Sequence, residues 1–178
     1  EKDSYPSELV VLWQAKAWAD RPTAVAWAKH CFKKMIQADV AAGVCDETSR
    51  YLLIQDNLDS QKQPEYLNVL STECKSDSHF TPEGMTDDVQ PVDDGLGWLL
   101  KCYMGQEEDA WLEDDDNLTK YENNELTASD RRILITQWYV KAYKRALAME
   151  AVRKFFVHTG GLLTADGSGD DLLKIESV

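Results

Sequence analysis

Tyr51-Leu-Leu-Ile-Gln-Asp-Asn57 is the stretch of sequence that decides how we interpret the fold of this chain. An apolar run stops abruptly at two short polar residues of the kind that favour turns. Because apolar side chains fall on both faces of the run, the pattern predicts a buried central strand over residues 51–55. Ligand-binding groups in α/β sheets gather at the carboxyl ends of strands, so Asp56 becomes the first candidate site residue.

Strand and helix signals alternate around this stretch. Residues 9–14 are apolar and β-branched and predict a strand. Asp20 can cap the helix that follows, with Pro22 in its first turn and Gly43 at its end. The same reasoning predicts a helix over residues 64–75, a strand remnant at His79-Phe80 and a turn-rich loop over residues 82–86. This alternation predicts a layered α/β core.

The second half of the chain has a helical pattern almost throughout. We expect a helix from Gly95 through Met104, and a long helical region that starts at a capping-box-like Thr127 and stops at Gly160. The polar tail over residues 166–171 is expected to be mobile. The predicted domains are therefore a core over residues 1–104 and an all-helical C-terminal extension over residues 105–178.

The net charge of −13 argues against a nucleic-acid partner when taken alone, because duplex binding requires Lys and Arg opposite the phosphates. The charge is unevenly spread, however. Acidic residues crowd residues 107–130, and basic residues crowd residues 131–154. The acidic residues can pair with the basic helix internally, or the basic helix can face a partner. We expect residues 107–116 to be exposed, without carboxylates converging on one point.

Cysteine, histidine and tryptophan patterns suggest no separate site. Four scattered cysteines without a C-x-x-C pair predict reduced intracellular thiols rather than a zinc site. His30, His79 and His158 lack ligand spacing and are expected at the surface. The tryptophans recur at helical spacing, which favours core packing over base stacking. No apolar run is long enough to cross a bilayer, so no membrane partner is expected.

Asp93, in the stretch Gln90-Pro-Val-Asp-Asp-Gly95, is the second candidate site residue. It stands just before a predicted helix. Asp56 and Asp93, brought together, would offer the hard oxygen ligands that Mg²⁺ or Mn²⁺ prefers. Two ions held there could activate water and stabilise the leaving oxygen in phosphodiester cleavage. An aspartate in such a position is more commonly a turn former or a helix cap, so the residues alone leave both interpretations open.

Several stretches resemble the catalytic domain of the pogo, Tigger and jerky-like transposases. Residues 52–59 resemble the second-aspartate motif of that family, a hydrophobic strand followed by Asp-Asn. Residues 82–86 resemble its proline-rich turn, and residues 90–95 resemble its Gln-Pro-aliphatic-Asp-x-Gly third-aspartate motif. Lys16-Ala-Trp18, just before the first predicted helix, also resembles the sequence of that family. Residues 111–117, 126–138 and 159–168 resemble a protist subgroup of DDE superfamily endonucleases, so the resemblance covers nearly the whole chain.

The resemblance implies a partial ribonuclease H-like core and a triad of acidic residues that holds two divalent ions, Mg²⁺ or Mn²⁺. By motif match, Asp56 is the second catalytic, metal-binding carboxylate and Asp93 is the third. In the intact enzyme they would serve strand cleavage and transfer on DNA at transposon ends, in the nucleus, and a homo-oligomer is left open. Asp94 matches a variable position, and we expect it at a helix N-terminus, where the dipole favours it. The two candidate carboxylates should lie about 4–8 Å apart.

The sequence also departs from the family's pattern. The family's first aspartate lies on a strand well upstream of Lys16-Ala-Trp18, and residues 1–15 offer no counterpart, since Asp3 stands too close to the start and Asp20 fits a helix cap. The family's helix-turn-helix region has no counterpart either, and residues 75–80 are unusually polar for the strand before the proline-rich turn.

These departures lead to one expectation and two alternatives. The chain starts at Glu1 rather than Met, so we interpret it as a fragment, a processed product or an incomplete gene model that is inactive by itself. One alternative is a catalytically inactive, transposon-derived or domesticated protein that acts through interactions. The other alternative is an unrelated acidic helical scaffold.

Overall fold

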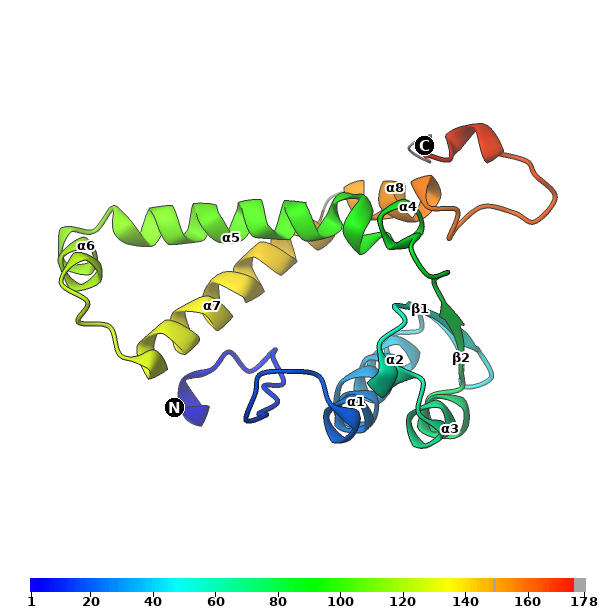
Figure 1. Cartoon of the computed structure of the whole chain (residues 1–178), viewed down its shortest axis with the longest axis horizontal. Helices are drawn as coiled ribbons and strands as arrows, with labels where there is room; N and C mark the ends of the chain where they lie inside the picture. Colours follow the sequence, from blue (N-terminus) through cyan, green and yellow to red (C-terminus); the bar gives the residue numbers. More distant parts are fainter. Residues whose placement is uncertain (149, 175–178) are drawn as a thin grey trace. The chain divides into compact units, whose positions relative to one another are not determined.

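The computed structural model describes residues 1–148 and 150–174 and shows a mixed, mostly helical fold with a small parallel sheet (Figure 1). The chain divides into two compact units. One unit comprises residues 10–86, and the other combines residues 1–9 with the described residues from 87 onward. Each unit is described by itself below. The predicted division into domains at residue 104 stays a prediction.

A capped helix opens the first unit, as the sequence predicts. The carboxylate of Asp20 accepts the backbone N–H of Thr23 at 2.9 Å, and Pro22 lies in the first turn. The helix runs through α1, a wider π-type turn and α2, and Gly43 follows it at φ +70°. Their bounds are Arg21–Trp27 for α1, Ala28–Phe32 for the π-type turn and Lys33–Ala41 for α2. The sequence did not predict the π-type turn.

A strand–helix–strand unit completes this part of the chain. Strand β1 (Tyr51–Gln55) pairs in parallel with β2 (Ser76–Phe80), and helix α3 (Pro64–Glu73) connects them. Helix α3 contributes Tyr66, Val69 and Leu70 to a core that also contains Ala24, Ala28 and Phe32. Each large side chain buried there stabilises the fold by about 1.5–3 kcal/mol. The predicted helix over residues 64–75 is confirmed, and the predicted strand remnant is a full strand.

Two strand predictions are wrong. Residues 9–14 have no strand partner among the described residues, and Trp13 there is 55% exposed. A strand needs the hydrogen bonds of a neighbour, which a local pattern does not reveal. Strand β1 exists as predicted, but it pairs only with β2 in the described sheet, and Leu52 is 64% exposed. It is therefore an edge strand rather than a buried central one.

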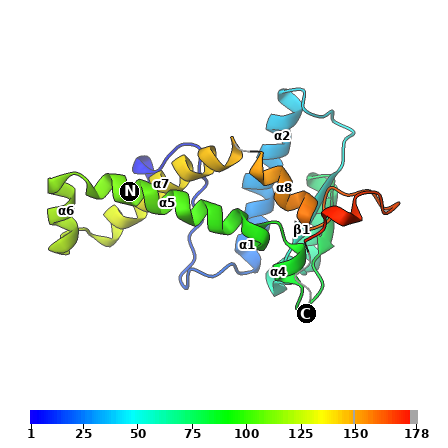
Figure 2. The same cartoon turned by 90° about the horizontal axis from the view of Figure 1, so that it is seen from above.

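The second unit is helical. Helices α5 and α7 lie side by side (Figures 1 and 2), and the rings of Trp111 and Trp138 meet edge to face between them with centroids 6.1 Å apart. Thr127 and Asp130 form the predicted capping box at the start of α7. The expected end at Met104 is wrong, because α5 continues through the acidic residues. The bounds are Thr86–Val89 for α4, Gly97–Leu112 for α5, Asp115–Glu122 for α6, Ala128–Leu147 for α7 and Ala151–His158 for α8.

Basic side chains of α7 pair with acidic residues of the same unit. Lys141 and Arg145 both contact the carboxylate of Glu107, at 3.2 and 3.5 Å. Arg132 and Lys144 pair with Glu1 and Glu8, at 2.7 and 2.6 Å. Internal pairing therefore occupies much of the basic surface of α7. The helices of the described residues lack the combination of length and apolar composition that crossing a bilayer requires.

Candidate functional site

Asp56 lies at the carboxyl end of β1, as predicted, and its side chain is exposed. Its Oδ1 accepts the backbone N–H of Asn57 at 2.7 Å. The side-chain amide of Asn57 donates to the carbonyl of Thr81, the residue directly after β2. The N–H of Thr81 in turn donates to the carbonyl of Gln55 at 3.0 Å. The Asp-Asn motif thus ties the ends of the two strands together while Asp56 faces outward.

A buried polar layer supports this strand end. The side chain of Gln55 is buried, and its Oε1 accepts the hydroxyl of Tyr66 at 2.9 Å. Burial raises the pKa of Tyr66 to about 12, so its phenol stays protonated at neutral pH. The hydroxyl of Thr81 is also buried and has no hydrogen-bond partner among the described residues. The backbone around Asp56 is therefore anchored from below by α3 and from the side by β2.

Asp93 lies on a wide, π-type turn over Val92–Leu96, directly before α5. The N–H groups of Asp93 and Asp94 both donate to the carbonyl of Gln90 at 3.0 Å. The preceding Pro91 is buried, whereas the side chain of Asp93 is exposed. The turn contains a kink, because Gly95 has a non-helical φ of +144°. The turn thus holds the backbone of Asp93 close to the N-terminus of α5 and leaves its carboxylate accessible.

Asp94 and His158 lie differently from what the sequence suggests. Asp94 stands in the turn before α5, where a helix dipole favours it, but it also makes a specific contact. Its Oδ2 lies 3.1 Å from Nδ1 of His158, and the two side chains are only 16% and 22% exposed. The prediction of a surface histidine is wrong for His158. It is right for His30 and His79, which are exposed.

The two candidate carboxylates belong to different units, Asp56 to the first and Asp93 to the second. Their predicted separation of about 4–8 Å therefore stays a prediction. Within the described parts of the chain, no cluster of three or more His, Cys, Asp or Glu side chains is arranged to hold a metal ion. As donors, both residues suit a hard divalent cation, because each presents an exposed carboxylate.

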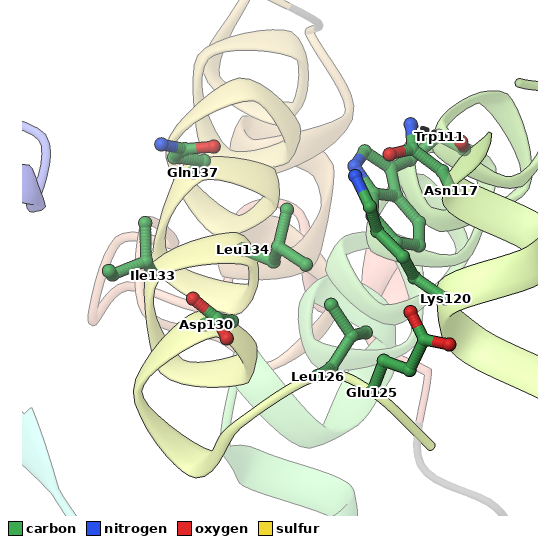
Figure 3. A pocket seen from close by; sticks show the side chains of 9 residues that line it. All are labelled: Trp111, Asn117, Lys120, Glu125, Leu126, Asp130, Ile133, Leu134 and Gln137. Carbon is green, nitrogen blue, oxygen red and sulfur yellow. Dashed lines mark hydrogen bonds between the residues drawn. The ribbon is translucent and has the colours of Figure 1, made fainter. Parts of the chain in front are cut away.

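The acidic stretch over residues 107–116 is partly exposed. Asp109 and Glu113 are exposed, as predicted, but Glu107 is half-buried between two basic side chains of α7. A separate hollow of about 490 Å³ is lined by residues of α6, of α7 and of the loop between them, together with Trp111 at the end of α5 (Figure 3). Asn117 donates there to the carbonyl of Trp111 at 3.1 Å, and the carboxylate of Asp130 serves the capping box. Both interactions stabilise helix ends.

Tryptophans provide a further correction. Trp27, Trp111 and Trp138 pack against other aromatic or core residues, as predicted. Trp13, Trp18 and Trp98 are 55%, 67% and 70% exposed, so core packing is the wrong prediction for these three. Trp98 lies in α5, where helical spacing gives the face of a residue without showing whether anything covers that face, whereas Trp13 and Trp18 lie outside the helices.

The family of the chain follows from comparison with known proteins. Residues 1–156 match the DDE superfamily endonuclease family, and the chain belongs to that family. No curated protein matches the chain. No solved structure matches it either.

Proposed function

We propose that this chain supplies Asp56 and Asp93 to the two-metal site of a DDE transposase that cleaves and transfers DNA strands. The observation that carries the proposal is the anchored Asp56-Asn57 pair at the end of β1, in a chain of the DDE superfamily endonuclease family. The parallel β1–α3–β2 unit would then be part of a ribonuclease H-like core. Asp93 follows on a constrained turn, in the order that the family's motifs require.

The chemistry needs carboxylates that hold Mg²⁺ or Mn²⁺ without moving. When bound, such ions activate water, then a DNA 3′-hydroxyl, and stabilise the leaving oxygen. The chain's own residues would fix the geometry. Asn57 and Tyr66 anchor the backbone beneath Asp56, and the carbonyl of Gln90 fixes the turn of Asp93. Preorganisation of this kind lowers the cost of reaching the reactive arrangement.

DNA is the proposed partner, and α8 offers better phosphate contacts than α7. The basic residues Lys141 and Arg145 of α7 are already paired with Glu107. Arg153 and Lys154 of α8 are exposed, and α8 as a helix lies against the turn that carries Asp93. Exposed basic side chains of this kind bind phosphate groups in a salt-dependent manner. A nuclear location and a homo-oligomer remain predictions that follow from this partner.

The experiment that tests the proposal measures Mn²⁺ binding to residues 1–178 by electron paramagnetic resonance. We expect Asp56→Asn and Asp93→Asn each to weaken binding. The matched controls are Asp59→Asn, which changes a neighbouring carboxylate that pairs with Arg21, and Asp88→Asn in α4. Equal effects of all four variants would mean that Mn²⁺ binds nonspecifically to an acidic chain, and the proposal would fail.

The second candidate function is that of a transposon-derived protein that acts only through interactions. The observation that favours it is the internal pairing of α7, since paired basic residues cannot neutralise phosphates without losing their partners. In that case Asp56→Asn and Asp93→Asn would leave Mn²⁺ binding unchanged, and duplex DNA would not bind at physiological salt.

A further inference from the structure

Helix α8 lies against the turn that carries Asp93, far from it in sequence but adjacent in space (Figures 1 and 2). Both segments belong to the same compact unit. Two side chains of α8 make the contact, Phe155 in its middle and His158 at its end. The helix therefore touches the turn at two separate points, which restricts how the helix and the turn can move relative to each other.

The first point is a close approach at Gly95. Its φ of +144° is a conformation that residues with a side chain rarely adopt. A Cβ atom at this position would lie 2.6 Å from Cε1 of Phe155. The phenyl ring thus rests directly on the backbone of the turn, two residues after Asp93. Only glycine allows both the backbone conformation and this contact.

The second point is the pair between Asp94 and His158. Nδ1 of His158 lies 3.1 Å from Oδ2 of Asp94, and both side chains are largely shielded from solvent. His158 is itself fixed by its backbone, because its carbonyl accepts the N–H of Lys174 at 3.0 Å. A shielded hydrogen bond between two fixed partners has little freedom to rearrange.

We infer that α8 positions the third carboxylate, and that His158 and Phe155 are positioning residues for Asp93. The inference rests on the proposed function, because it assumes that Asp93 is a metal ligand. Asp94 is held by His158 and Gly95 is covered by Phe155, so the peptide of Asp93 cannot rotate independently. Side chains that orient a metal ligand from behind affect metal binding without touching the ion. The C-terminal helix is thus part of the site rather than an appendage to it.

The test combines hydrogen exchange with Mn²⁺ binding in residues 1–178. The variants are His158→Ala, which removes the contact with Asp94, and His158→Asn, whose side-chain amide can replace Nδ1. His30→Ala is the control, since it removes an exposed histidine elsewhere. Phe155→Leu is a milder second variant that keeps an apolar side chain in α8 and reduces the contact with Gly95. Thermal unfolding, followed by circular dichroism, identifies any variant that has lost its fold.

We expect His158→Ala to speed amide exchange in peptides covering residues 90–96 and to weaken Mn²⁺ binding by about threefold to tenfold, the size of one hydrogen bond. His158→Asn should restore both properties in large part, whereas His30→Ala should change neither. Phe155→Leu should also speed exchange in the same peptides. A melting temperature close to that of the parent protein shows that the effect is local.

Three outcomes would overturn the inference. Unchanged exchange in His158→Ala would mean that the pair does not hold the turn. Faster exchange with unchanged Mn²⁺ binding would mean that His158 stabilises the turn without positioning Asp93 as a metal ligand. If His158→Asn weakened Mn²⁺ binding as much as His158→Ala, the effect would come from the packing of the imidazole ring rather than from its hydrogen bond with Asp94. The proposed function is judged separately, because its test compares Asp56→Asn and Asp93→Asn with the Asp59→Asn and Asp88→Asn controls and does not use the α8 variants.

Discussion

Gly95 combines a left-handed backbone conformation with a phenyl ring against the place where a Cβ would be. We predict that Gly95→Ala destabilises the protein by at least about 1–3 kcal/mol, from backbone strain and overpacking. Gly105→Ala is the matched control. Gly105 lies inside α5 with open space around it, so alanine there should stabilise the helix by up to about 1 kcal/mol. Urea unfolding of both variants measures the difference, and equal stabilities would contradict the geometry of the turn.

Tyr66 is the polar anchor beneath Asp56, and its removal should weaken the first unit. Tyr66→Phe leaves the Oε1 of Gln55 buried without its donor, which we expect to cost about 1–2 kcal/mol. Tyr121→Phe, at an exposed position of α6, should have little effect. The comparison is made by urea denaturation at pH 7. A similar small effect in both variants would mean that the Tyr66 hydroxyl does not support the strand end.

The same tyrosine predicts a pH dependence. Its pKa is raised to about 12 in the folded protein, above the value of about 10 for an unfolded chain. Between these values the folded state binds more protons than the unfolded state, so stability must fall as pH rises from about 10 to about 12. In Tyr66→Phe the fall should be shallower. Unfolding free energies measured across this range would refute the assignment if parent and variant had the same slope.

At the residue scale, the sequence predicts positions better than contacts. Asp56 at the end of a strand follows from a local pattern, and so does the cap at Asp20. The bridge from Asn57 to Thr81 and the pair of Asp94 with His158 join residues far apart in the chain. No spacing rule predicts such pairs, because they depend on how helices and strands pack after they have formed. His158 therefore looked like an ordinary surface histidine.

The start of α7 gives a prediction at the scale of the element. The hydroxyl of Thr127 accepts the N–H of Asp130, and this capping box satisfies backbone groups that the helix leaves unpaired. We expect Thr127→Ala to cost about 1 kcal/mol. Thr136→Ala, in the middle of the same helix, should stay within about 0.5 kcal/mol of the parent. Chemical unfolding compares the two, and equal losses would show that the cap does not stabilise α7.

Helices were predicted well and strands less well, for a physical reason. Helix hydrogen bonds are local, so caps such as Asp20 and stops such as Gly160 can be recognised in the sequence. Strand hydrogen bonds come from a neighbour, so residues 9–14 could look like a strand and still lack a partner in the described sheet. Residues 76–80 show the converse. They are polar, yet they form β2 because the backbone of β1 pairs with them.

Charge dominates the behaviour of the whole molecule. The net charge of −13 opposes association with duplex DNA, and α7 offsets part of that charge internally through Glu107, Glu8 and Glu1. Exposed ion pairs of this kind contribute little to stability and weaken as salt screens them. Their main consequence is for binding, because a phosphate must compete with a carboxylate for each paired lysine or arginine.

The candidate site is also a property of the whole molecule, since Asp56 and Asp93 lie in different compact units. A two-metal site requires carboxylates that hold both ions a few ångströms apart. Asp3 and Asp20, which precede the first helix or cap it, are unsuited to this role. Asp3 lies in a short turn over Lys2–Ser4, and the carboxylate of Asp20 is occupied by the N–H and hydroxyl of Thr23. Under the proposed function, Asp56 and Asp93 supply two of the three carboxylates that the family's chemistry uses, and neither Asp3 nor Asp20 suits the position of the third.

We accordingly predict that residues 1–178, purified by themselves, bind Mn²⁺ weakly and do not nick DNA. Mg²⁺ gives up its water reluctantly, two carboxylates form an incomplete site for either ion, and the net negative charge further weakens contact with the duplex. The measurement is incubation with supercoiled plasmid and Mn²⁺, beside an Asp56→Ala control, with relaxed circles separated on a gel. Nicking by the parent protein that disappears in Asp56→Ala would refute the prediction, because it would require a complete site with a third ligand among these residues. Nicking that persists in Asp56→Ala would instead identify a contaminating nuclease.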